Sequence, residues 1–213
     1  MAAWFRFITK ERSGVWLAAG GGILALSLLG FGAWYWWDAS QSAGRIALFD
    51  ASRLAQEAAS PQGTPAQRDA TLKALGDALA RYPRSTAAPE AAYSLGNLHY
   101  QARSFEAARM AYQASLKAGA RGSLAQLNRL GIGYAWEGQR EHVAALAAYE
   151  ELLGKLGPSD FLYEDVLLAT ARAQELLKRR SQALETYQRH LAAFPRSRRA
   201  EEVRARLASL EGL

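Results

Sequence analysis

The sequence predicts an all-α protein, in which an N-terminal transmembrane helix precedes a series of packed helix pairs. Three observations support this prediction. Residues 15–37 form a run of 23 residues without a charged side chain. Later in the chain, related patterns recur at nearly regular intervals, which indicates a structural repeat. No segment alternates convincingly between apolar and polar residues with the period of two that strands show.

The uncharged run, VWLAAGGGILALSLLGFGAWYWW, is long enough to cross a bilayer. Its only clear polar side chain is Ser27. As a helix it would be about 34 Å long, which matches the hydrocarbon core of a membrane. Indole and phenol rings favour the headgroup boundary, so the residues that we expect at the membrane interfaces are Trp16, Trp34, Tyr35, Trp36 and Trp37. Small residues near one face would let a second transmembrane helix approach, unless they only reflect how common glycine is in such helices; they are Ala18, Gly22, Ala25 and Gly32.

Two other interpretations of this run fit less well. A cleaved signal peptide has a shorter apolar region and a cleavage site of small residues, whereas this run ends in bulky aromatic residues. A buried core helix would normally show a polar face. We therefore expect an uncleaved anchor.

The charges that flank the run predict its orientation. Arg6, Lys10 and Arg12 precede it and Asp38 follows it. Under the positive-inside rule, residues 1–14 form a cytoplasmic tail and the chain after the anchor lies on the other side of the membrane. In a bacterium this describes a single-pass protein of the inner (plasma) membrane with a periplasmic C-terminal domain.

The remaining chain is expected to be helical throughout. Residues 38–65 are expected to form a helical stalk or first repeat helix and a linker, because two prolines and a glycine in SPQGTPA (60–66) break the helix. Residues 66–213 form the repeat domain. Its expected helices lie near 67–82, 86–102, 104–119, 122–137, 140–154, 160–178 and 181–194, with a capping helix over 196–211.

The repeat is visible in several spaced residues. RYPRS at 81–85 returns as AFPRS at 193–197, and Tyr112, Tyr149 and Tyr187 follow one another at nearly equal steps. The segment SLGNLHY (94–100) is similar to RLGIGYAW (129–136). This similarity aligns Gly96 with Gly131, and the next equivalent residue is Ala171. The alignment implies about two extra residues in the turn of the second unit. The pattern resembles the tetratricopeptide repeat, a helix-turn-helix unit in which small residues let two helices pack closely. The resemblance implies a helical solenoid.

No residue pattern points to chemistry. The chain has no cysteine, and its three histidines lack the spacing of metal ligands on a helix. Adjacent carboxylates on a helix point apart and usually mark a solvated face. The net charge of +6 is modest for a nucleic-acid-binding protein. We therefore expect no enzymatic activity, no cofactor, no metal, no nucleic acid and no small-molecule substrate.

Repeat helices do offer a concave surface for a partner protein. Aligned on Gly96, Gly131 and Ala171, the positions that face this surface are Tyr93, Asn97, Tyr100, Gln101, Asn128, Ile132, Trp136, Leu168 and Arg172. Trp136 is expected to be a partly exposed anchor, with burial in the core as the rival explanation, while Tyr93 and Tyr100 have packing between helices as an alternative role. The basic stretch 178–206 is either a solvated face or a surface for anionic lipid or an acidic partner.

The layout of the whole chain resembles the bacterial YfgM-like proteins, with the local likeness in residues 30–58, GFGAWYWWDASQSAGRIALFDASRLAQEA. This resemblance implies an ancillary subunit of the Sec translocon whose periplasmic domain meets emerging chains or chaperones. We expect a membrane-anchored adaptor of protein export or folding, with the bilayer and other membrane proteins as partners. The YPRS and FPRS turns look more like envelope-coordinator and outer-membrane-assembly repeat proteins, so the alternative is a structural coordinator of envelope biogenesis or cell division. A third interpretation is an anchored receptor with its repeats in the cytosol.

Overall fold

The computed structural model describes residues 2–58, 60 and 64–212, and the side chains of these residues except 2–20 and 25. Over these residues the chain is all-helical, without a strand, in agreement with the predicted all-α class. It divides into two compact units, residues 1–43 and residues 44–213.

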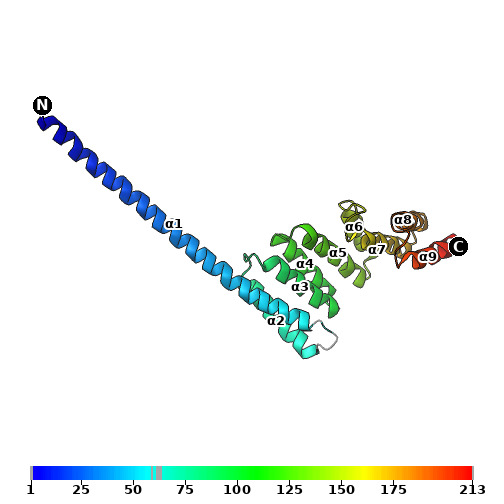
Figure 1. Ribbon diagram of the computed structural model, residues 1–213. Coiled ribbons are helices and arrows are strands. Elements are labelled where there is room, and N and C mark those ends of the chain that lie inside the picture. The colour runs from blue at the N-terminus through cyan, green and yellow to red at the C-terminus, as the bar shows by residue number, and fades with distance from the viewer. Residues whose placement is uncertain (1, 59, 61–63, 213) are drawn as a thin grey trace. The chain divides into compact units, whose positions relative to one another are not determined.

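The helices follow one another in chain order (Figure 1). Their bounds are α1 Ala2–Ala58, α2 Pro65–Arg81, α3 Ala88–Gln101, α4 Phe105–Lys117, α5 Gly122–Gly138, α6 His142–Leu153, α7 Tyr163–Leu176, α8 Arg180–Ala193 and α9 Ala200–Glu211. Helix α2 begins at a capping box, in which the Thr64 hydroxyl accepts from the Gln67 main-chain N–H and the Gln67 side chain accepts from that of Thr64.

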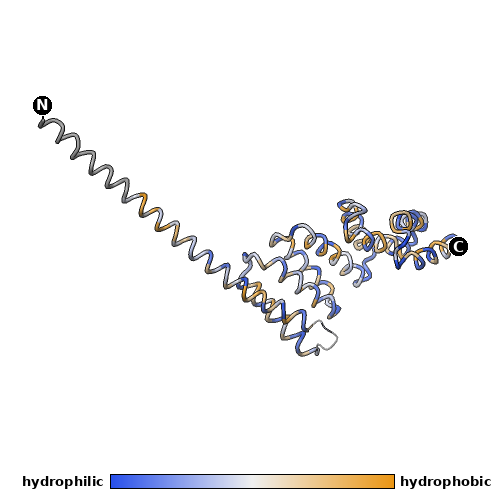
Figure 2. The backbone as a smooth tube through the Cα atoms, in the orientation of Figure 1, coloured by the Kyte–Doolittle hydropathy of each residue, from blue (hydrophilic) through white to orange (hydrophobic). Residues whose placement is uncertain are grey.

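The structure corrects the prediction of a transmembrane helix over residues 15–37. None of the helices, over the residues that can be described, has a stretch both long enough and apolar enough to cross a membrane. The physical reason is that an uncharged stretch is not necessarily a strongly apolar one. Four glycines lower the mean hydropathy of residues 21–32. The uncharged stretch then ends with indole and phenol rings, which Asp38 follows. Figure 2 shows the hydrophobic colour fading along this part of α1.

The side chains of only some of the residues expected at membrane interfaces and at a helix contact are described by the structure. Trp34, Tyr35, Trp36 and Trp37 are exposed. At Gly22 and Gly32 an added Cβ would meet no atom of the described residues within 4 Å. The other three predicted residues lie outside the residues whose side chains are described; they are Trp16, Ala18 and Ala25.

The core of residues 44–213 is distributed along the stack of helices. Leu48 of α1 packs with Leu75 of α2 and Leu98 of α3 in one buried cluster. Further buried clusters join α4 to α5, α6 to α7 and α7 to α9. Hydrophobic and hydrophilic residues mix along each of these helices in Figure 2, as expected of helices that bury one face. These buried clusters therefore join helices that follow one another in the sequence.

The structure also corrects the register of the repeat. A Cβ at Gly96 would lie 2.5 Å from the Tyr112 ring. A Cβ at Gly131 would also collide with the Tyr112 ring, whereas a Cβ at Gly133 would collide with the Tyr149 ring. The step along the sequence from Gly96 to Tyr112 equals the step from Gly133 to Tyr149. The equivalent small residue of the second helix pair is therefore Gly133, whereas the sequence alignment placed it at Gly131.

The turns within the helix pairs have the same register. Arg103, Arg140 and Lys178 have φ values of 58°, 63° and 58°. Each of them precedes the tyrosine of its own unit by the same step along the sequence; these tyrosines are Tyr112, Tyr149 and Tyr187. Each turn is closed by the same main-chain hydrogen bond, such as Glu141 N–H to Trp136 C=O at 3.0 Å. The second unit therefore has no extra residues in its turn, contrary to the sequence alignment.

Candidate partner-binding groove

Three hollows adjoin one another along the first helices of the helix pairs in residues 44–213. The first, of about 540 Å³, lies between the C-terminal part of α1 and α3; the second, of about 220 Å³, lies between α3 and α5. The third, of about 160 Å³, lies among α5, α7, α8 and α9. Tyr93, Asn97 and Tyr100 line both the first and the second hollow, and Tyr134 lines both the second and the third. Neighbouring hollows thus share lining residues, and the three together are called the groove below.

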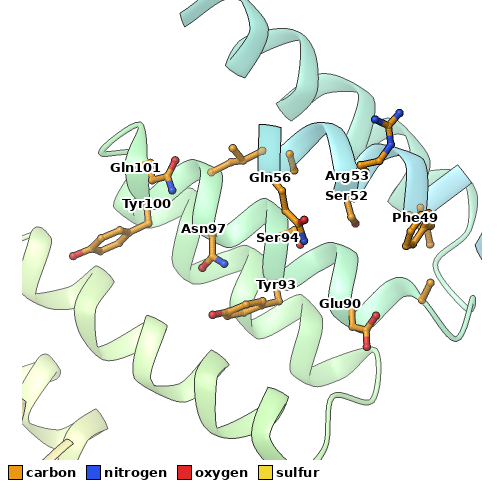
Figure 3. A pocket seen from close by; sticks show the side chains of 14 residues that line it. Phe49, Ser52, Arg53, Gln56, Glu90, Tyr93, Ser94, Asn97, Tyr100 and Gln101 are labelled. Atoms are coloured by element: carbon orange, nitrogen blue, oxygen red, sulfur yellow. The ribbon is translucent and has the colours of Figure 1, made fainter. Parts of the chain in front are cut away.

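The first hollow owes its chemistry to one stripe of α3. Tyr93, Asn97 and Tyr100 occupy positions i, i+4 and i+7, which share a helix face. In Figure 3 the Asn97 amide lies between the two tyrosine rings. Packing fixes both rings, because Tyr93 contacts Tyr112 at 5.9 Å and Tyr100 contacts Phe105 at 5.5 Å between ring centroids. The stripe presents two rigid rings with an amide between them.

Asn97 is oriented by a buried tyrosine behind it. The Tyr112 hydroxyl donates to Oδ1 of Asn97 at 2.9 Å. Burial raises the pKa of Tyr112, so this hydroxyl keeps its proton and its role as the donor. No hydrogen bond of the Asn97 Nδ2 group to another described residue is found. This amide can therefore donate into the groove.

The wall opposite α3 is contributed by α1. Phe49 is 69% exposed although it lines the hollow, and Gln56 adds a second side-chain amide (Figure 3). Arg53 on this wall pairs with Glu57 at 2.7 Å, and Glu90 stands on the α3 side. The first hollow therefore combines apolar rings, amides and charges of both signs.

The third hollow closes the other end of the groove. Arg172 of α7 and two arginines of α9 and the turn before it, Arg206 and Arg199, line it together with Tyr134 and Tyr187. Burial raises the pKa of Tyr134, and the charge of Asp165 raises it further, so the hydroxyl is protonated and can donate. This end of the groove is the most strongly polar.

The predicted groove residues are only partly brought together. Tyr93, Asn97, Tyr100 and Gln101 share the first hollow, while Leu168 and Arg172 line the third. The structure places three other predicted residues away from the groove, and they are Asn128, Ile132 and Trp136.

Each of these three residues has a structural partner instead. Asn128 is fully buried, and its Nδ2 donates to Ser115 Oγ and to the main-chain oxygen of Leu124, both at 2.8 Å. Trp136 packs against the buried cluster that includes Tyr149, and the Arg109 guanidinium covers its ring at 3.8 Å. Ile132 packs against a cluster that includes Tyr112.

The register correction explains this outcome. With Gly133 aligned to Gly96, the positions equivalent to Tyr93 and Asn97 become Leu130 and Tyr134 in α5, and both line the second hollow. The nearly equal spacing of the three tyrosines along the sequence indicates this register. The alignment was wrong because it used the shorter spacing between Gly96 and Gly131. The groove residues from α1 and α9 lie outside the repeat, so no repeat signal could have found them.

No known protein family matches this sequence, and no curated protein matches it. Among the side chains that can be described, no group of three or more histidines and carboxylates could hold a metal ion.

Proposed function

We propose that this protein is a non-enzymatic adaptor that holds an extended segment of a partner protein in its groove. The observation that carries the proposal is the continuity of the three hollows through the shared residues Tyr93, Asn97, Tyr100 and Tyr134. A series of adjoining hollows lined by several helices suits a chain segment better than a single compact ligand.

The chemistry of the lining favours an extended segment over a helical one. A helix satisfies its own main-chain groups, whereas an extended segment needs donors and acceptors from its binding site. Asn97, Gln56 and Gln101 supply amides to the first hollow. The rings of Tyr93 and Tyr100 would contact the side chains of the segment, since rigid aromatic rings give large contact areas at a low entropic cost.

The partner class is suggested by sequence alone. The likeness to YfgM-like proteins favours a substrate or chaperone of protein export as the partner that this adaptor holds. The alternative, a coordinator of envelope biogenesis or cell division, is favoured by the two related turns, which close with equivalent hydrogen bonds, Ser85 N–H to Tyr82 C=O and Ser197 N–H to Phe194 C=O, both at 3.1 Å.

A blocked groove tests the proposal. The full chain would be immobilised and offered a displayed library of random peptides about ten residues long, which span about 33 Å when extended. Ser94 lines the first hollow, so Ser94→Arg should fill it and reduce capture at least about tenfold, equivalent to about 1.4 kcal/mol. Ser123→Arg adds the same side chain at an exposed position outside the hollows and should leave capture unchanged. Equal capture by both variants would refute the groove as the binding surface.

A further inference from the structure

Three arginines line the third hollow, and two of them are paired with carboxylates. Arg199 pairs with Asp165, and Arg206 lies 3.2 Å from Glu175 and 4.0 Å from Glu202. For the exposed Arg172, by contrast, no ion pair or hydrogen bond with another described residue is found. Asp165 and Glu202 line the hollow, and Glu175 beside it pairs with Arg206. Arg172 therefore lines the groove without an ion-pair partner among the described residues.

The hollow also holds an uncommitted hydroxyl donor. Tyr187 donates to Glu175 at 2.9 Å, so its hydroxyl is occupied. Tyr134 packs edge-on against Tyr149, and its hydroxyl makes no hydrogen bond to any residue that the structure describes. Arg172 and Tyr134 occupy equivalent positions of successive first helices, because the step between them along the sequence equals the step from Tyr149 to Tyr187. Guanidinium and phenol thus line one small cavity together.

We propose that this hollow binds the carboxylate of an aspartate or glutamate side chain in the segment held by the groove; the inference rests on the proposed function. A guanidinium recognises a carboxylate through two parallel N–H donors, and the Tyr134 hydroxyl supplies a third. The volume of about 160 Å³ is sufficient for one side chain of this size.

A carboxylate fits better than a phosphate group. A phosphate carries a charge of about −1.5 to −2 at neutral pH. Asp165 and Glu202 line the same hollow and would repel the second charge, whereas a single negative charge balances Arg172. The position of the hollow adds direction: the acidic residue lies at the end of the segment that is far from Phe49 in the order of the hollows.

The test uses the same displayed library on the full chain and on Arg172→Gln. Arg196→Gln is the matched control, because it removes the same charge from an exposed position that does not line the hollow. We expect peptides captured by the wild type and by Arg196→Gln to be enriched in Asp or Glu near one end. Arg172→Gln should lose this enrichment while peptides are still captured through the first hollow. A captured peptide should bind at least about tenfold more weakly to the wild type after its acidic residue is changed to the amide.

The other outcomes overturn the inference. Capture without acidic enrichment, or equal enrichment in Arg172→Gln, would refute the carboxylate site and leave the groove as the binding surface. Loss of binding on amidation of the peptide C-terminus, but not on the Glu→Gln or Asp→Asn change, would show that the hollow takes a terminal carboxylate instead. Absence of any capture by the wild type would refute the proposed function and this inference together.

Discussion

At the scale of single residues, tyrosine rings set the spacing of the helix pairs. Tyr149 packs where a Cβ at Gly133 would stand, and Tyr112 does the same at Gly96. In the third pair the small residue is Ala171, and Tyr187 follows it by the same step along the sequence. The paired helices can approach closely because the small residue on one helix leaves space for the tyrosine ring of the other.

Gly133→Ala should therefore destabilise the protein. The added methyl group would overlap the buried Tyr149 ring, and overpacking of this kind costs about 1–3 kcal/mol. Gly76→Ala is the control, because a Cβ there meets nothing within 4 Å and alanine favours a helix interior by about 1 kcal/mol. Urea denaturation should lower the free energy of unfolding for the first variant and raise it for the second. A stabilised Gly133→Ala protein would contradict the packing described here.

We infer that Trp136 is a structural residue and not a binding anchor. It is half-buried, packs against a core cluster and is covered by Arg109. Trp136→Ala should cost about 2–4 kcal/mol of folding stability, because it leaves a cavity and removes a ring–guanidinium contact. Peptide capture per folded molecule should stay unchanged. Normal stability with lost capture would instead return Trp136 to the binding surface.

At the scale of elements, Glu164 joins three successive parts of the C-terminal repeat. Its carboxylate, on α7, accepts hydrogen bonds from the Ser197 hydroxyl, before α9, and from Nε2 of the buried His190 of α8, at 3.1 Å. Burial acts to raise the pKa of Glu164, but these hydrogen bonds outweigh it, so the pKa lies below its usual value. Arg199 contributes in the same direction.

This contact predicts an acid-dependent loss of stability. A carboxylate with a lowered pKa in the folded state stabilises the protein above its unfolded pKa of about 4.3 and loses this contribution as the pH falls through the folded value. Glu164→Gln should therefore be less stable than the wild type by about 1–2 kcal/mol at pH 7, with the difference narrowing below about pH 4. Denaturant unfolding at a series of pH values measures this. A difference that stays constant down to the acid limit would exclude an ionised Glu164 as the cause.

The sequence predicted the elements better than it predicted the groove. Helix positions followed from hydrophobic periodicity and from breaks at proline and glycine, as at the linker before α2. The groove depended on register, and a choice between Gly131 and Gly133 moved every predicted residue of α5 to a different face. The contributions of Phe49 and Arg199 could not be predicted, because they depend on how α1 and α9 pack beside the repeats.

At the scale of the molecule, residues 44–213 contain every buried cluster described above, whereas residues 21–37 expose large apolar side chains on all sides of α1. Contiguous exposed apolar surface of this kind favours association. We expect the full chain to self-associate in aqueous buffer and a chain of residues 44–213 to be a folded monomer. Size-exclusion chromatography with light scattering, together with circular dichroism, tests both expectations. An unfolded 44–213 fragment, or a monomeric full chain, would contradict them.

We propose that a partner segment lies along the first helices of the helix pairs, and site-specific photocrosslinking would test this placement. A photoreactive phenylalanine analogue would replace Gln101, which lines the groove and is exposed, and in a second protein Met110, which is exposed on α4 outside the groove. With a peptide captured by the full chain, we predict a crosslink from position 101 and essentially none from position 110. A crosslink from position 110 with none from position 101 would place the partner on the second helices and contradict the account.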